Sequence, residues 1–99
     1  METQTKPEMI VAQTGEQFKV LKVTGIKGMV MPSHLSTKEA VIIILKGEAV
    51  IKLTNKEIHL KINESAIIPA KEPHILIIKK DLEANVIMKT DSEIEFITN

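Results

Sequence analysis

Four residue types are missing from this 99-residue sequence: cysteine, arginine, tryptophan and tyrosine. Without cysteine the chain has no disulfide framework, no zinc–thiolate site and no thiol nucleophile. Without arginine it has no planar guanidinium fork to bind a phosphate or a carboxylate. The thirteen basic residues are all lysine and are scattered along the chain, and the only aromatic residues are Phe18 and Phe96. We therefore expect no binding to nucleic acid, which needs a basic surface interleaved with stacking side chains.

The sequence also lacks a long apolar run and an excess of charge of either sign. Its longest apolar run, residues 40–45, is far too short to cross a bilayer, and residues 1–8 are polar where a signal peptide would be apolar. Thirteen lysines balance thirteen acidic residues. The absence of cysteine is compatible with the reducing cytoplasm. We expect a soluble cytoplasmic protein without a membrane segment.

What the sequence does contain is many β-branched apolar residues, in short stretches separated by turn residues. Apolar residues make up 43% of the chain, which is typical of a folded domain rather than a disordered one. In residues 56–62, apolar and polar side chains alternate as in a half-buried strand. Gly47 is expected to separate two strands, and Lys79 and Lys80 to form a solvated turn. Roughly eight to ten strands, with a turn about every ten residues, predict an all-β sandwich or barrel.

No linker or repeat divides the chain. We expect residues 1–15 to form an N-terminal arm and residues 16–99 to form a single domain. Residues 41–45 and 75–78 are apolar on both faces, although the outer face of an antiparallel sheet is normally polar. A domain this small has little spare sheet to cover both strands, so we expect them to form the interface of a homodimer.

Two spaced motifs carry a family resemblance. The first, GMVMPSHLSTKEAVIIILKG, begins at Gly28, contains His34 and ends at Gly47. The second, NESAIIPAKEPHILII, contains Pro69 and His74. With these spacings the chain resembles the small single-domain cupins, which implies a cupin jelly-roll β-barrel, also called a double-stranded β-helix. Three residues depart from the second motif, replacing its two glycines and its closing asparagine: Asn63, Lys71 and Ile78.

The resemblance also implies a metal site, of which this chain has half. In metal-binding cupins, two histidines and a glutamate of the first motif and the histidine of the second hold one divalent ion inside the barrel. His34 and His74 stand at two of these positions, whereas Ser36 and Ala40 stand at the other two. Glu39 is the nearest substitute carboxylate, but it needs a one-residue bulge to reach inward, because neighbouring strand residues point to opposite faces. The sequence leaves open which of Glu39 and Ala40 faces the interior.

Other residues near the motifs form less specific patterns. Met29 and Met31 suggest a soft copper site, but strand alternation places both on the face opposite to His34, where we expect them to pack. Ser36 lacks the orienting acid and the oxyanion hole that would make it a nucleophile. His59 lies on the polar face of its strand and is interpreted as a solvated surface residue.

Three functions are compatible with these residues. The leading hypothesis is a non-catalytic or residual binding module whose pocket, edged by His34, Ser36 and His74, holds a small molecule or a weakly bound divalent metal ion, if it holds a cofactor at all. The first alternative is a metal-dependent enzyme of the isomerase or dioxygenase type that uses His34, His74 and a displaced Glu39. The second alternative is a structural, dimeric protein-interaction module. The resemblance does not choose among them, because one fold hosts many functions.

Overall fold

The computed structural model describes residues 6–97, which form eight strands in one antiparallel sheet. The strands are β1 (Glu8–Thr14), β2 (Phe18–Gly25), β3 (Val30–Ser36), β4 (Ala40–Lys52), β5 (Glu57–Leu60), β6 (Ser65–Ile68), β7 (His74–Lys89) and β8 (Ile94–Phe96). Within this described part, no helix is long and apolar enough to cross a membrane. The arrangement confirms the prediction of an all-β jelly-roll.

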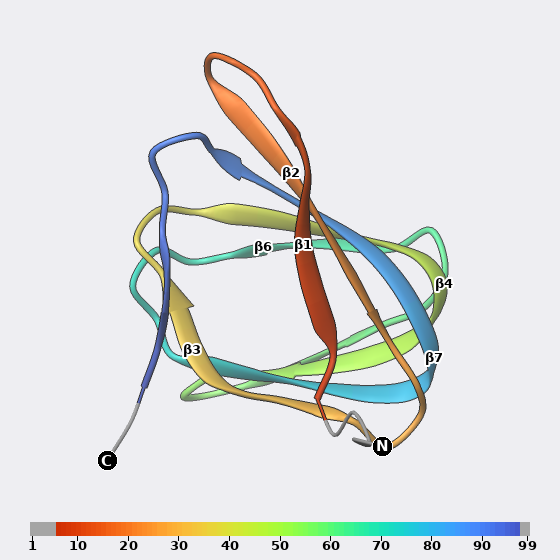
Figure 1. Ribbon diagram of the computed structural model, residues 1–99. Coiled ribbons are helices and arrows are strands. Elements are labelled where there is room, and N and C mark those ends of the chain that lie inside the picture. Colours follow the sequence, from red (N-terminus) through yellow and green to blue (C-terminus); the bar gives the residue numbers. More distant parts are fainter. Residues whose placement is uncertain (1–5, 98–99) are drawn as a thin grey trace, which may run out of the picture.

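Two long strands, β4 and β7, fold the sheet onto itself. Residues 40–44 of β4 pair with residues 84–88 of β7, and residues 49–52 pair with residues 75–78. Between these two ladders the register shifts three times, so both strands bend and pass from one layer of the sheet to the other. Figure 1 shows β7 curving in this way along one side of the barrel.

The bends divide the sheet into two layers that enclose the core. The first layer has the strand order β1-β2-β7-β4-β6, and the second has the order β8-β3-β7-β4-β5. The core between them is built from aliphatic and methionine side chains, of which Ile44, Ile51 and Ile78 are fully enclosed. Burying one such side chain contributes about 1.5–3 kcal/mol, so the inward apolar rows hold the two layers together.

A glycine makes the bend of β4 possible. Gly47 has a φ of +87°, and a Cβ atom at this position would lie 2.1 Å from the carbonyl oxygen of Asp81 in β7. The two strands approach this closely only because residue 47 has no side chain. The expected break at Gly47 is therefore a bend within one strand, and the expected turn at Lys79 and Lys80 is likewise a bend within β7.

The expected N-terminal arm is partly a strand. Residues 8–14 pair with β2 as strand β1, while residues 1–5 and 98–99 lie outside the described part of the chain. Met9 lies opposite Val23 and packs against the core, whereas most of β1 is exposed. A strand with so little buried surface has too short an alternation to be recognised from sequence.

The two segments that are apolar on both faces belong to different layers. Val41 and Ile43 lie on the outer face of the first layer, and Ile75 and Ile77 lie on the outer face of the second. All four side chains are half-buried. Because β4 and β7 bend between the layers, the two segments belong to two separate outer surfaces.

Candidate functional site

A cavity of about 40 Å³ lies between the two layers. It has room for an ion or a few water molecules, and it is far smaller than the roughly 300 Å³ at which pockets for drug-sized ligands begin. Of the described residues that line it, three are polar and eleven are apolar. They are His34, Ser36 and His74, and Met9, Val23, Met31, Ala40, Ile42, Ile51, Ile68, Leu76, Val86, Met88 and Ile94.

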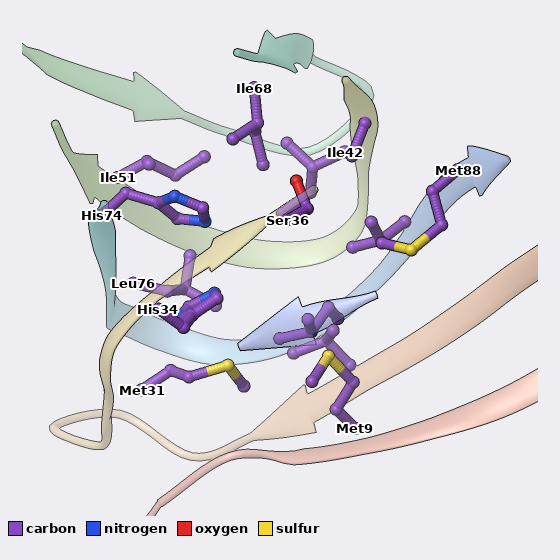
Figure 2. A pocket seen from close by; sticks show the side chains of 14 residues that line it. Met9, Met31, His34, Ser36, Ile42, Ile51, Ile68, His74, Leu76 and Met88 are labelled. Carbon is purple, nitrogen blue, oxygen red and sulfur yellow. The ribbon is translucent and has the colours of Figure 1, made fainter. Parts of the chain in front are cut away.

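The two cavity histidines come from neighbouring strands. His34 of β3 and His74 of β7 are direct partners in the antiparallel ladder, and their ring centroids lie 4.3 Å apart with an angle of 61° between the rings. Directly opposed residues project to the same face of a sheet, so both rings line the cavity, as Figure 2 shows. The structure thus brings together the two residues that the motifs place at ligand positions.

Hydrogen bonds fix which nitrogen of each ring carries the proton. His34 Nδ1 lies 2.7 Å from the carbonyl oxygen of Pro32, and His74 Nδ1 lies 2.9 Å from that of Glu72. A carbonyl oxygen only accepts, so both Nδ1 atoms donate, and each Nε2 of a neutral ring keeps its electron pair. Because residues 6–97 contain no enclosed side-chain nitrogen or oxygen without a hydrogen-bond partner, the Nε2 atoms face accessible space. A backbone carbonyl on the other ring nitrogen is a usual support for a metal-binding histidine.

Burial keeps the ring of His34 neutral. Removal of the ring from water lowers the pKa of His34, the hydrogen bond to Pro32 raises it in part, and the neighbouring His74 ring lowers it again. A protonated ring has no electron pair to offer to a metal or to a hydrogen-bond donor. Near neutral pH, His34 therefore offers an acceptor rather than a positive charge.

The other motif positions supply no metal ligand of the expected kind. The hydroxyl of Ser36 donates to the backbone carbonyl of Lys38 at 2.8 Å, rather than to an imidazole as in an activated nucleophile. Ala40 lines the cavity and is 3% exposed. Glu39 is exposed and borders a separate surface hollow beside Phe18. Since neighbouring residues of an extended chain point to opposite sides, Ala40 faces the interior and Glu39 is not brought to the histidines.

The residues present do not fit the divalent ion that the resemblance implies. Among residues 6–97, no three His, Cys, Asp or Glu side chains are grouped closely enough to hold one metal ion. The described lining residues include no carboxylate, whose charge would compensate for a buried divalent cation. Two imidazoles leave such an ion short of both ligands and negative charge.

Met31 also lines the cavity, contrary to the expectation from strand alternation. Met31 pairs with Leu76, and His34 pairs with His74. Between these two pairs β3 advances by three positions and β7 by only two. The extra residue forms a β-bulge, which reverses the alternation and turns Met31 to the same face as His34. The available signal in the sequence was Pro32, because proline inside an antiparallel sheet favours an edge or a bulge.

The backbone supports the alignment of the two motifs. Among the described residues, a positive φ occurs at Gly28 (+97°), Gly47 (+87°), Asn63 (+70°) and Lys71 (+63°). These are the four positions at which the two motifs have glycine. The Lys71 turn also contacts the site, because its N–H donates to the carbonyl of Ser36 at 2.7 Å. The turn geometry is therefore present even at the two positions where the glycine is not.

The third histidine lies outside the cavity. His59 is on β5 with an exposed side chain, and its Nε2 lies 3.3 Å from Glu57 Oε1. This position confirms the interpretation of His59 as a surface residue. It also makes His59 an internal reference for experiments on the two cavity histidines.

Comparisons with known proteins agree with this geometry. Residues 23–88 match the family described as cupin domain. A cupin superfamily protein from Desulfitobacterium hafniense is 18% identical, with a TM-score of 0.78 over 92% of this chain and 84% of that one. The DMSP lyase DddQ from Ruegeria pomeroyi is 17% identical, with a TM-score of 0.82 over 92% of this chain and 51% of that one.

Similarity extends to proteins with different names. KdgF from Halomonas sp. is 12% identical, with a TM-score of 0.74 over 91% of this chain and 85% of that one. No protein of curated function matches the sequence. At identities this low, the likeness to solved structures shows the fold alone.

Proposed function

The chain belongs to the cupin family, and from this premise we propose that it is a ligand-binding cupin rather than a metal-dependent enzyme. One observation carries the proposal: His34 and His74 offer Nε2 electron pairs to a cavity whose other described lining residues, apart from Ser36, are apolar. Such a cavity binds through two acceptors. Its described lining residues include no carboxylate, and the Ser36 hydroxyl donates to a backbone carbonyl rather than to an imidazole.

Size and chemistry limit the ligand. The cavity of about 40 Å³ admits a metal ion or a molecule of a few non-hydrogen atoms. A molecular ligand must present hydrogen-bond donors to the two Nε2 atoms and an apolar surface to the surrounding side chains, because an unpaired polar group in this cavity would be penalised.

Nitrogen NMR of the histidines tests the proposal. Long-range ¹H–¹⁵N spectra would be recorded during titrations with methanol, ethanol and acetamide. We expect the Nε2 signals of His34 and His74 to shift together on addition of at least one of these probes, while those of the exposed His59 report only non-specific effects. If His59 responds to every probe and the cavity pair to none, the proposal is wrong.

The alternative function that we propose to test is a metal-dependent enzyme, and a DMSP lyase of the same fold supplies a substrate for the assay. Elemental analysis of protein purified without a chelating column, together with an assay for DMSP turnover, distinguishes the two functions. We expect far less than one divalent ion per chain and no turnover, because the described lining residues provide two imidazoles and no carboxylate. A full equivalent of metal with turnover would establish the enzyme in place of the binding protein.

We propose further that a second copy of the chain covers the outer face of the first layer. Ile67, Val41, Ile87 and Val20 are successive cross-strand partners on β6, β4, β7 and β2, so they form one apolar row across four strands. A two-fold axis through this row would pair it with the same row of a second copy, and an interface of standard size buries about 800 Å² per partner.

Sedimentation of a charged variant tests this dimer. Ile67 is 58% exposed within the row, and Ile26 is 57% exposed in the turn between β2 and β3. We expect the parent and Ile26→Lys to sediment as dimers at micromolar concentration and Ile67→Lys as a monomer. A parent that stays monomeric at high concentration, or an Ile67→Lys variant that stays dimeric, would contradict this assembly.

A further inference from the structure

Three thioethers line the same cavity as the two imidazoles, and the proposed function does not use them. Met9 comes from β1, Met31 from β3 and Met88 from β7. Figure 2 shows their sulfur atoms and the two imidazole rings around one space. The cavity therefore combines two nitrogen donors with three sulfur atoms on three different strands.

The position of Met31 distinguishes it from the other methionines. The β-bulge between Met31 and His34 places the two side chains on one face of the same strand, although they are three positions apart in the sequence. Met29 lies only two residues earlier, but its sulfur accepts the N–H of Ile26 at 3.4 Å and it is not among the lining residues. The bulge thus places the thioether of Met31 beside the imidazoles, whereas Met29 lies outside the cavity.

The donor set is soft. Thioether sulfur selects Cu(I) among the biological metals, imidazole nitrogen also binds copper, and carboxylate oxygen suits hard ions such as magnesium, calcium and manganese. The described lining residues contain the first two donor types and no carboxylate. Without a carboxylate the cavity is a poor site for a divalent ion. Cu(I) does not depend on a carboxylate ligand.

Charge points to the same ion. Most of the lining side chains are buried, and those described carry no negative charge, so the protein stabilises a bound cation there through dipoles and electron pairs. The desolvation penalty of an ion grows with the square of its charge, so a monovalent ion pays about a quarter of what a divalent ion of equal size pays. A neutral, soft-donor cavity therefore favours a monovalent soft cation over a divalent one.

The imidazoles are already oriented for such an ion. The Nδ1 atoms of His34 and His74 are held by the carbonyl oxygens of Pro32 and Glu72, so the Nε2 atoms keep the electron pairs. Fixing the ring orientation in this way strengthens metal binding, since less order has to be imposed when the ion enters. Pro32 belongs to the bulge that also turns Met31 inward, so one local feature of β3 sets both ligands.

We propose that the cavity is a Cu(I) site in which His34 Nε2, His74 Nε2 and Met31 Sδ bind the ion, with Met9 and Met88 completing a soft, apolar surround. This inference rests on the proposed function, because it names the ligand of the same cavity. The inference goes beyond the proposed function because it specifies the metal, its oxidation state and a methionine ligand that the cupin motifs do not contain.

An anaerobic competition titration tests the site. Cu(I) would be added to the full chain in the presence of bathocuproine disulfonate, whose coloured complex reports the copper that the protein fails to take. We expect the parent to withdraw one equivalent of Cu(I). Met31→Leu should weaken the affinity for Cu(I) by about 10- to 100-fold. Loss of a residue that only supports a metal ligand already lowers metal affinity by about this factor. Met29→Leu should leave the affinity unchanged, because Met29 does not line the cavity.

The two leucine variants are matched controls. Exchange of methionine for leucine conserves volume and normally changes stability by less than about 1.5 kcal/mol, so both proteins should fold. If Met31→Leu nevertheless fails to fold, Ag(I) added to the parent labelled with ¹³C at the methionine methyl groups gives the answer. We expect the Met31 methyl signal to shift at one equivalent and the Met29 signal to stay unchanged.

Two results would overturn the copper site. One is a parent that withdraws no Cu(I) from the competitor. The other is an equal response of Met29 and Met31, either in the affinities of the two variants or in the Ag(I) spectra. If copper fails while the Nε2 signals of His34 and His74 still respond to the alcohols or the amide, the proposed binding function stands without this inference. If nothing moves those signals, both are wrong.

Discussion

The turns of this protein and its cavity depart from the cupin pattern in opposite ways. At Asn63 and Lys71 the glycine of the motif is absent, yet the backbone keeps the positive φ that the glycine would serve. At Ser36 and Ala40 the metal ligand is absent, and the described residues provide no substitute for it in the cavity. The geometry of the fold is retained where the residue changes, whereas the chemistry of the divalent site is not.

The difference has a physical reason. The cost of a left-handed backbone depends on the residue type. Asparagine tolerates this conformation well, and other non-glycine residues adopt it at a cost of about 1–2 kcal/mol. A coordination shell depends on donor atoms, and the methyl group of Ala40 has none. A substitution in a turn therefore lowers the stability of the protein by a small amount. Removal of a donor atom from a ligand set abolishes metal binding.

The largest predicted effect comes from a substitution at the bend of β4. Gly47→Ala puts a methyl group where its Cβ would lie 2.1 Å from the carbonyl oxygen of Asp81, in addition to the strain of a φ of +87°. We expect it to lower the free energy of unfolding by about 3 kcal/mol or more, or to prevent folding. Gly28→Ala shares the positive φ but meets nothing within 4 Å, so it should lose about 1 kcal/mol. Urea unfolding of the two variants measures the difference, and equal losses would show that φ alone decides.

A second prediction sharpens the cavity side of the comparison through pH. The pKa of His34 is lowered by burial, so between its folded and unfolded pKa values the unfolded chain holds more protons than the folded protein. The free energy of unfolding should therefore fall as the pH drops below about 6.5, the value of an unperturbed histidine, and should level off below the lowered pKa.

Two variants assign this pH dependence. His34→Gln should flatten the fall in stability between pH 7 and pH 5, and His59→Gln, which removes an exposed ring outside the cavity, is the reference variant. Thermal melts across this range measure both. A parent whose stability does not fall, or an equal slope in parent and His34→Gln, would mean that His34 is protonated as readily in the folded protein as in the unfolded chain. The neighbouring His74 is the other titratable group that faces this ring.

The smallest predicted effect restores a missing glycine. Lys71 is exposed and has a φ of +63°, so Lys71→Gly relieves backbone strain while giving the unfolded chain more freedom. We expect a net gain of about 0.5 kcal/mol in the free energy of unfolding. Asn63→Gly should gain nothing measurable, since asparagine tolerates this region. A loss of stability in Lys71→Gly would mean that the lysine side chain contributes contacts that outweigh the strain.

Much of the fold was predictable from periodicity and punctuation. Alternation identified the residues that form β5, and the two motifs predicted that His34 and His74 belong to one site. The bends of β4 and β7 were misread as breaks, because Gly47 marks a change of direction equally well inside a strand and between strands. Residues 8–14 of the expected arm form strand β1, which alternation does not reveal because only a small part of it packs against the core.

The two histidines of the site could be predicted from the sequence, but the methionines that line the same cavity could not. Spacing identified the two histidines, and the structure answers the question that alternation left open by turning Ala40 inward and Glu39 outward. The contribution of Met31 could not be read from alternation, because one extra residue in β3 reverses the face of everything before it. Met9 and Met88 come from distant parts of the chain, and only the closure of the sheet brings them to the same cavity.

The central claim is that the cavity keeps the geometry of the cupin metal site and has lost the donors for a divalent ion. The most direct test is to put the missing donors back with the double change Ser36→His and Ala40→Glu, both at cavity-lining positions. Without metal, the buried carboxylate should lower the stability of the variant.

Thermal melts with Mn²⁺, Ni²⁺ or Zn²⁺ against a chelator are the measurement. We expect the ion to stabilise the double variant by about 2.7 kcal/mol at one hundred times its dissociation constant, a shift in Tm of about 10 °C or more, and to leave the parent almost unchanged. Equal shifts in parent and variant would mean that the parent already holds a working divalent site. No shift in the variant would mean that residues 36 and 40 do not converge with His34 and His74. Either result would contradict the claim.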